Sequence, residues 1–556
     1  MKPFFIVLSA ALTVGTAIAQ TSAQSSAPGS EASAALAAAE KILDVSNHTL
    51  LPDAMAEQAG RMLGDDDLFV RAAAEWALSL KVGNENMLDQ AKWPMATNPA
   101  WFVKWRAIPL AQRVEMDWCR QAIAAGISRN PEKLISQIET MARRLQHQIE
   151  SRALKPAAGE TAKSGVTQLK SMARTARSFK SHREVRDSWL AARRILRPLV
   201  FQHQAIDFDA LVFATRHSPH HKANVCGIQH NGTYKPGGDI TIVRGLEAVR
   251  DVREVIGDQL PQGHVHGMDL HFDGRKLVFG YGKQLNWPPK REAHFPQPGN
   301  SNWALHLRQD LEGVGLYEIN TDGSGLQRLT SHPVWSDTEP VYCPNDDVAF
   351  TSERSSHSPP CDSENNDITD TNLYLYQRDQ GSIRRLTHHR DVDMTPRLLN
   401  NGLLAYLHWE YQERHFNENH SIWTIRPDGT NADAYYKSHI PYPWALREVR
   451  SIPDTDKLVA IAAGHHCYSR GPIVVIDPNQ GGNNPAAMSL MTTGVLPQEG
   501  KMNDATGPVP FGGVTDHRGY YRNPYPLSET VMLSSYTYAS AYCDRHTTSA
   551  SPGTPS

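Results

Sequence analysis

The sequence lacks the motifs of covalent cofactor attachment and has few cysteines. Six cysteines occur in 556 residues, and none belongs to a C-x-x-C-H motif. The nearest string runs from Cys226 to His230, with one thiol and the wrong spacing for a c-type haem. We therefore expect no haem and no other cofactor, with the identity of any metal ion unknown. Cys343 and Cys361 flank one loop and are the favoured disulfide pair; the alternative is that both thiols are free and buried.

Common catalytic signatures are absent as well. The chain has no G-x-S-x-G, no H-E-x-x-H, no Walker A motif and no strand-linked G-x-G-x-x-G. We therefore expect no appended serine hydrolase domain. A large net charge of either sign is also lacking, because the chain has 56 basic and 59 acidic residues. This balance indicates no general preference for polyanions.

Long hydrophobic runs are missing beyond the first twenty residues. Lys2, the apolar stretch 4–14 and Ala17-Ile18-Ala19 have the pattern of a signal peptide over residues 1–19. No later stretch is long and apolar enough to span a bilayer. We expect an exported protein, periplasmic or secreted, with no transmembrane segment and no nucleic acid partner. Residues 20–33 and 544–556 are small and polar, and we expect a disordered leader and a disordered tail there.

What is present begins with helical periodicity over residues 34–200, with HEAT-like character at its start. Asn130-Pro131 predicts one helix start, and Ser181 with Glu184 predicts a capping box at another. That last helix is expected to stop at Pro198. Residues 155–166 are expected to be a flexible link within this helical domain.

The helical domain is basic in its second half. Residues 131–197 hold 15 Lys and Arg against 6 Asp and Glu, a local net charge of 15 − 6 = +9. One interpretation is contact with an acidic partner. The other is a solvated helix face whose charge is balanced by the rest of the chain.

Residues 201–543 repeat a sequence pattern that predicts pairs of short β-strands. Segments 337–354 and 391–411 each contain an Asp (Asp337 and Asp393) followed three residues later by Pro, and continue with two short hydrophobic strands around a turn. The two aspartates are 393 − 337 = 56 residues apart. A period near 50 with about four strands per repeat is typical of a β-propeller, because one blade cannot bury its own faces.

Inner-strand starts near residues 209, 269, 337, 393, 447 and 528 give a count of six blades. The expected fold class is therefore α plus all-β, with a helical domain followed by a six-bladed propeller. We expect the last blade to be incomplete, because the residues after 540 show no hydrophobic alternation. A gap between the last and first blades, with weaker stability or self-association, would follow.

Several motifs in fixed order carry a resemblance over roughly residues 205–540. They are DGSGLQRLT, EPVYCPNDDVAFTSER, HWEYQER, AGHH and GPIVVIDP. Together they resemble the TolB-like propeller of the hydrazine synthase alpha-subunit middle-domain family. The resemblance implies the fold, but without haem motifs the haem chemistry does not transfer. An Arg commonly precedes WEY in that family, whereas His408 stands here, so the ion pair of that Arg does not transfer directly.

Candidate ligand-binding residues cluster at the ends of strands, where propellers bind ligands through loops. Trp409 and Glu410 suit stacking and hydrogen bonding to a sugar or peptide. The alternative is that Trp409 packs between blades and Glu410 forms a structural ion pair with Arg414. The candidate ligand-binding residues are Arg354, Trp409, Glu410, Arg414, His465 and His466.

Histidines in two places suggest metal ligands, with structural alternatives. His465, His466 and Cys467 offer soft to borderline donors, or they cap strand edges through backbone hydrogen bonds. Strand alternation would aim His264 and His266 to one side, and Asp269 and His271 to the other, as two imidazoles that can share a metal. Alternatively, these are polar residues near a turn of the propeller repeat.

The favoured function is a non-catalytic binding or scaffold module that presents a propeller face to a protein or polymer. No catalytic residue is identified, because one carboxylate offers no paired acid and base. The rival is a metal-dependent polysaccharide lyase or hydrolase acting in the propeller channel. A third option, a subunit of a periplasmic redox complex, follows from the resemblance alone.

Overall fold

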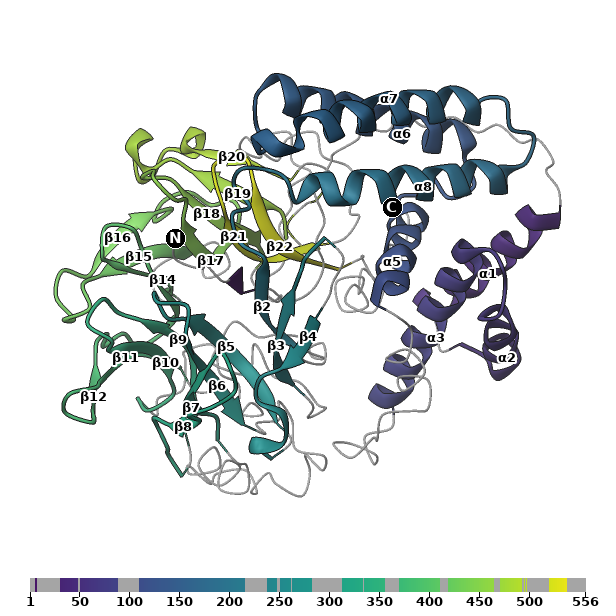
Figure 1. Cartoon of the computed structure of the whole chain (residues 1–556). Helices are drawn as coiled ribbons and strands as arrows, with labels where there is room; N and C mark the ends of the chain where they lie inside the picture. The colour runs from purple at the N-terminus through teal and green to yellow at the C-terminus, as the bar shows by residue number, and fades with distance from the viewer. Residues whose placement is uncertain are drawn as a thin grey trace, which may run out of the picture.

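The structure, a computed structural model, covers the helical part and most of the strand part of the chain. It describes residues 6–7, 31–48, 51–88, 110–215, 238–247, 251–261, 263–282, 313–333, 335–355, 370–410, 419–464, 471–492, 495, 497 and 520–537. Apart from the two-residue strand at residues 6–7, helices come first and mainly antiparallel strands follow, as the periodicity predicts. Figure 1 shows the helices gathered on one side of the molecule and the strands on the other.

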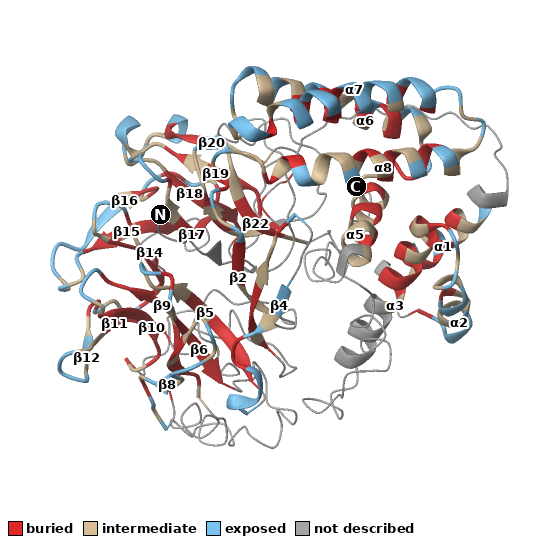
Figure 2. Cartoon of the chain, viewed as in Figure 1, coloured by how far each residue is buried: buried red, intermediate tan, exposed pale blue. Residues whose placement is uncertain are grey.

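The helical part consists of hairpins of amphipathic helices around a large apolar core, with a smaller cluster between α1, α2 and α3. The helices are α1 (Glu31–His48), α2 (Asp53–Met62), α3 (Leu68–Leu88), α5 (Leu110–Ala124), α6 (Pro131–Glu150), the 3-10 turn η2 (Pro156–Ala158), α7 (Gly159–Ala176) and α8 (His182–Val200). Figure 2 shows buried residues on the inward faces of α6, α7 and α8 and exposed residues on their outward faces. Among the described residues, no helix has the length and apolar character needed to cross a membrane.

The predicted helix starts are confirmed by their cap geometry. The Asn130 side chain accepts a hydrogen bond from the Lys133 amide at 3.0 Å, with Pro131 at the first helical position. Ser181 and Glu184 form the predicted capping box of α8. These local hydrogen bonds satisfy amides that have no partner inside the helix.

Two helical expectations are wrong. Residues 155–166 are η2 and the start of α7, because the apolar side of α7 packs against α6 and α8. Gly165 permits this approach, since an added Cβ would lie 2.9 Å from a methyl group of Leu199. In addition, α8 continues through Pro198 to Val200. Pro198 lacks the amide that would donate to the carbonyl group of Arg194, and the helix ends two residues after it.

The strands form antiparallel meanders. The strands are β1 (Ile6–Val7), β2 (Ala210–Thr215), β3 (Asp239–Arg244), β4 (Asp251–Glu254), β5 (His264–Leu270), β6 (Lys276–Gly282), β7 (Gly315–Asn320), β8 (Gln327–Arg328), β9 (Asp337–Tyr342), β10 (Val348–Ser352), β11 (Asn372–Gln377), β12 (Ser382–Arg385), β13 (Val392–Leu398), β14 (Leu404–Trp409), β15 (His420–Ile425), β16 (Asp433–Tyr436), β17 (Ala445–Ser451), β18 (Leu458–Ala463), β19 (Ile473–Ile476), β20 (Met488–Leu490), β21 (Tyr520–Pro526) and β22 (Met532–Thr537). The 3-10 turns η4 (Gly257–Gln259), η5 (Pro478–Gln480) and η6 (Pro485–Ala487) lie between them.

These strands make five hydrogen-bonded sheets: β1–β4, β5–β8, β9–β12, the eight-stranded sheet β13–β20, and β21–β22. The eight-stranded sheet contains two meanders, β13–β16 and β17–β20, which meet through one parallel pair between His420 and Ala445. Strand β1 also pairs in parallel, with β2.

Apolar clusters join each meander to the next around a ring. Successive clusters connect β2–β4 with β5–β8, that meander with β9–β12, and so on through β13–β16 and β17–β20 to β21–β22. A further cluster brings Leu533 of β22 against Leu211 of β2, with Phe201 after α8 beside them. This circular packing of antiparallel meanders is the arrangement of a β-propeller.

The expected gap between the last and first units is therefore not seen among the described residues. Burial of Leu533 and Leu211 in one cluster fastens the two ends by side-chain packing. The sheets themselves are not joined into a closed ring by hydrogen bonds in the described part of the chain. The count of six blades thus stays a prediction, as does the incompleteness of the last one. The start of its first strand differs from the expected position, because β21 begins at Tyr520 rather than near residue 528.

A bulge with left-handed backbone recurs in every inner strand from β5 onward. The residue with positive φ is Gly267 in β5, Glu339 in β9, Thr395 in β13, Glu448 in β17 and Asn523 in β21. The proline that follows the repeat aspartate occupies this bulge in β9 and β13, where a missing amide donor is tolerated. The bulges lie at one level of the ring, since Gly267 approaches Glu339, and Glu448 accepts the Nδ2 donor of Asn523 at 3.2 Å.

The expected disulfide of Cys343 is also wrong. Cys343 is a free thiol, fully buried in the cluster between β9–β12 and β13–β16. Burial raises the pKa of this thiol to about 12. The residue acts as a small apolar side chain, which is the alternative that the sequence left open. Cys361 lies outside the described residues.

Candidate functional site

The inner strands all begin on one face of the ring, which we call the N-terminal face. The repeat aspartates Asp337 and Asp393 lie there, each two residues before the bulge of its strand. Asp337 pairs in register with Ser352, and Asp393 with His408. The two meanders therefore place equivalent carboxylates in equivalent positions with different neighbours.

Asp337 is enclosed in a complete ion pair. The Arg354 guanidinium donates to its two carboxylate oxygens at 3.0 and 2.6 Å, and the Ser352 hydroxyl donates at 2.6 Å. The aspartate is fully buried, whereas the Arg354 side chain is 17% exposed. Bidentate pairing of this kind satisfies both charges and is geometrically specific.

Asp393 lies between two imidazoles instead. Its Oδ1 atom is 2.6 Å from Nδ1 of His408 and 3.9 Å from Nδ1 of His389. One ligand atom of each of these three residues lies within 4.8 Å of the others. We call His389, Asp393 and His408 the His–Asp cluster.

Further polar and aromatic groups surround the His–Asp cluster. Glu410 brings Oε1 to 3.4 Å from Nε2 of His408 and accepts a 2.7 Å hydrogen bond from the Asn419 amide. The carboxylate of Asp391 is 3.7 Å from Nε2 of His389. The His408 ring lies between those of His389 and Trp423, with centroid distances of 4.1 Å to each.

The surrounding charges and burial shift the pKa values of the two imidazoles in opposite directions. Burial disfavours the charged form of His408, but the Asp393 carboxylate, followed by Glu410, outweighs it and raises the pKa to about 9. Burial lowers the pKa of His389, and the neighbouring His408 lowers it further against the opposing effect of Asp393. The geometry therefore favours one charged and one neutral imidazole around one carboxylate.

The structure separates the predicted site residues. Glu410 and Arg354 lie on the N-terminal face, partly exposed. Trp409 is fully buried and its indole stacks on His420, with ring centroids 5.4 Å apart. The expectation that Trp409 offers a stacking surface on the rim is therefore corrected: the aromatic ring packs inside the meander. Arg414, His465 and His466 lie outside the described residues.

The other histidine motif does not form one site. His264 and His266 are both buried, with ring centroids 5.9 Å apart. The bulge at Gly267 follows them and breaks the alternation on which their predicted arrangement with Asp269 and His271 relied. His271 lies near the opposite end of β5 and contacts Asp346 at 2.8 Å.

A second polar group combines residues of three inner strands. Asp269 of β5, Arg397 of β13 and Arg450 of β17 come from three different meanders, and the two guanidinium groups oppose the effect of burial, which raises the pKa of Asp269. Arg450 also stacks over the ring of Tyr525, 4.9 Å from its centroid. Arg397 is tied to Glu339 at 3.0 Å. The contacts of Arg450 and Arg397 thus join neighbouring inner strands, β17 with β21 and β13 with β9.

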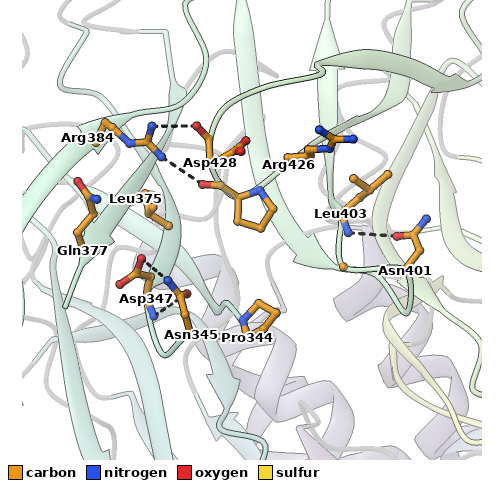
Figure 3. Close-up of a pocket in the computed structure, with 12 residues that line it drawn as sticks. Pro344, Asn345, Asp347, Leu375, Gln377, Arg384, Asn401, Leu403, Arg426 and Asp428 are labelled. Carbon is orange, nitrogen blue, oxygen red and sulfur yellow. Dashed lines mark hydrogen bonds between the residues drawn. The ribbon is translucent and has the colours of Figure 1, made fainter. Parts of the chain in front are cut away.

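A pocket of about 550 Å³ lies at the opposite end of the strands from the His–Asp cluster. It is bounded by the β9–β10, β13–β14 and β15–β16 turns (Figure 3). Arg384 crosses it and donates to the backbone carbonyl groups of Asp428 and Pro427 at 2.8 and 3.4 Å. The residues that line it include none of the predicted site residues.

The His–Asp cluster was not predicted from the sequence. His408 was noted only as the residue before Trp409, and His389 and Asp393 were not among the predicted site residues. The usable signal is the 56-residue period, because 352 + 56 = 408 aligns a serine with a histidine opposite the repeat aspartate. His389 precedes the strand in a connection, where periodicity carries no information.

The basic helices are partly neutralised within the helical domain. Arg177 pairs with Glu139 at 2.9 Å, and Arg194 pairs with Glu115 at 2.6 Å. Arg143 and Lys170 remain exposed. An acidic partner for this surface stays a prediction.

Comparisons with known proteins do not establish a family. No family model and no curated protein matches the sequence. Hydrazine synthase of Kuenenia stuttgartiensis is a structural neighbour with 14% identity and a TM-score of 0.41, matched over 59% of this chain and 42% of that chain. A putative TolB from Agrobacterium tumefaciens has 12% identity and a TM-score of 0.31, over 48% and 79% of the two chains. TolB from Acinetobacter baumannii has 11% identity and a TM-score of 0.25, over 53% and 67%.

The chain thus spans about two fifths of the length of the hydrazine synthase chain that it matches. At these low TM-scores and identities, the likenesses carry no argument about function. The propeller arrangement rests on the sheets and apolar clusters of this chain.

Proposed function

We propose that the protein is an exported propeller module that binds a protein or polymer partner at its N-terminal face. The finer assignment, to the TolB-like hydrazine synthase alpha-subunit middle-domain family, belongs to this proposal and is supported by the shared sequence motifs. No haem chemistry is part of it, because the chain has no C-x-x-C-H motif.

The observation that carries the proposal is the placement of Arg354 and Glu410. They occupy equivalent positions in adjacent meanders, since 354 + 56 = 410. Their side chains are 17% and 23% exposed, on the same face of the ring. Both residues lie just after a strand, β10 or β14, and each also has a partner inside the chain. The exposed parts of these two oppositely charged groups suit a partner that carries both charges, as a peptide or protein does.

A site-specific crosslinking experiment tests this function. A photoreactive amino acid would replace Glu410 in one variant and Asp433, an exposed residue of β16, in the control. In the cells that express the protein, we expect a discrete crosslinked adduct from position 410 and none from position 433. Equal adducts from both positions, or none from either, would contradict the proposal.

A metal-dependent polysaccharide lyase or hydrolase is the second candidate, and the His–Asp cluster favours it. Two imidazoles and a carboxylate are ligands with which catalytic metals are commonly held. The discriminating measurement is the release of unsaturated or reducing ends from polygalacturonate. Activity that is lost in an Asp393→Asn variant would support the enzyme over the binding module.

A further inference from the structure

We propose that His389, Asp393 and His408 bind one divalent transition metal ion of the zinc class. Two imidazole nitrogens and one carboxylate oxygen lie within 4.8 Å of one another. Zinc is commonly held by three such ligands, with water or substrate in the fourth position. The proposal does not depend on the partner of the N-terminal face.

The strongest argument comes from the preceding repeat of the same chain. There, Arg354 and Ser352 supply positive charge and a hydroxyl to Asp337. In the β13–β14 repeat, the position of Ser352 is taken by His408, which brings a ring nitrogen to the carboxylate.

The position of Arg354 is taken by Glu410, so a cationic group is replaced by a second carboxylate. Without a metal, a protonated imidazole supplies the positive charge beside Asp393. A divalent cation bound between the imidazoles would replace that proton and supply positive charge where the preceding repeat has a guanidinium.

The surroundings hold the three ligands in place. The Thr371 hydroxyl donates to the backbone carbonyl of Asp393 at 3.0 Å, and the Asn372 amide donates to that of His389 at 3.0 Å. These bonds fix the backbone on both sides of the connection. Packing between His389 and Trp423 fixes the ring of His408. Such supporting contacts are typical of metal sites, where they orient the ligands.

The site has both room to adjust and a path of entry. Tetrahedral zinc needs ligand atoms roughly 3.4 Å apart for bonds of about 2.0–2.1 Å. Asp393 and His408 are closer than this, at 2.6 Å, and His389 and Asp393 are wider, at 3.9 Å. Side-chain rotations that move the ligand atoms by about 1 Å would bring them to the spacing of tetrahedral zinc. His389 has a side chain 26% exposed, which opens the site to solvent.

The alternative is that the His–Asp cluster is a structural hydrogen-bond group without a metal. The two roles differ in what happens when the cluster is converted to the arrangement of the preceding repeat. The double substitution His408→Ser with Glu410→Arg would recreate the Ser352 and Arg354 neighbours beside Asp393. The β9–β10 repeat shows that this backbone accepts that arrangement.

The test is zinc titration of the full chain after chelator treatment, in competition with a chromophoric chelator. Wild type, H408S/E410R and the control H271Q would be compared. His271 also contacts a carboxylate, at 2.8 Å, but lies outside the cluster. We expect wild type and H271Q to bind one more zinc equivalent than H408S/E410R, or to bind it at least about tenfold more tightly.

A single substitution, His389→Gln, keeps the test valid if the double variant does not fold. Its folding would be checked by circular dichroism, and cobalt would replace zinc as a spectroscopic probe. We expect the visible absorption of bound cobalt to change or vanish in H389Q and to persist in H271Q. Equal zinc stoichiometry and affinity, or unchanged cobalt spectra, in the cluster variants and wild type would overturn the metal site.

Discussion

The meanders β9–β12 and β13–β16 have the same backbone plan but different chemistry at the N-terminal face. Each begins its inner strand with a buried aspartate and bends it at a left-handed residue followed by proline. In the first, Asp337 is closed off by Arg354. In the second, Asp393 contacts His408, whose other nitrogen is 3.4 Å from Glu410.

The difference shows which positions of the repeat change from one meander to the next. The bulge, the turn and the apolar face recur because packing between neighbouring meanders constrains them. The chemistry differs at two positions near the end of the second strand, where Ser352 and Arg354 in one meander correspond to His408 and Glu410 in the other. Function on a shared scaffold depends on such positions rather than on the fold.

The largest expected effect concerns Trp409, whose counterpart in the preceding repeat is Glu353, since 353 + 56 = 409. Trp409→Ala should lower the free energy of unfolding by about 3–5 kcal/mol, because it removes a fully buried ring. Urea unfolding measures this, with exposed Asp433→Asn as a control that should change little. A near-native stability with lost partner binding would instead restore Trp409 as a contact residue.

The second prediction compares the loss of stability when each of the two repeat aspartates is removed. Asp337→Ala leaves a guanidinium without its carboxylate and should cost about 3 kcal/mol, at the low end for a buried pair because Arg354 reaches solvent. Asp393→Ala should cost only about 1–2 kcal/mol in metal-free buffer, because imidazoles can lose their proton. Urea unfolding of both variants in chelator checks this. Equal losses would show that the two carboxylates have the same structural role.

The third prediction concerns how each meander is tied to its neighbour at the opposite face. Glu318 of β7 accepts hydrogen bonds from Arg378 at 2.7 Å and Tyr342 at 2.8 Å, and these outweigh burial and hold its pKa below the ordinary 4.5. The corresponding tie of Arg384 to the β15–β16 turn uses backbone carbonyls, which do not titrate in this range.

A depressed carboxyl pKa means that the stabilisation by Glu318 is complete above its unfolded pKa and is lost as pH falls through the folded one. Glu318→Gln should therefore be less stable than wild type at neutral pH, and the difference should shrink below about pH 4.5. Thermal melts across acidic pH measure this. Arg384→Gln serves as the contrast, because its effect should not vary with pH; a constant deficit in Glu318→Gln would contradict the assignment.

The smallest effect is expected at Cys343, which corresponds to Leu399 in the next repeat, since 343 + 56 = 399. Both side chains are buried. Because burial raises the thiol pKa to about 12, Cys343 should not react with iodoacetamide in the native protein at mildly alkaline pH. It should react after unfolding without reductant, as peptide mass spectrometry would show. Failure to react then would indicate a disulfide.

Much of the architecture was predictable because its causes are local. The caps at Asn130 and Ser181 follow from side chains that reach an amide a few residues away. The repeat was visible because alternation and turn residues mark each strand pair. Three other features were not predictable, because each depends on neighbours distant in sequence. They are the buried thiol of Cys343, the helix at residues 159–176 and the packing of Leu211 against Leu533.

The sequence by itself determined the order of the helical and strand parts, the 56-residue period and the aspartates at the start of the repeat, Asp337 and Asp393. Only the tertiary structure decided that Trp409 points into the packed interior and that His389 comes beside Asp393 and His408. The physical reason is that alternation assigns a side chain to one face of a strand, whereas the neighbours of that face are chosen by sheet register and by packing around the ring.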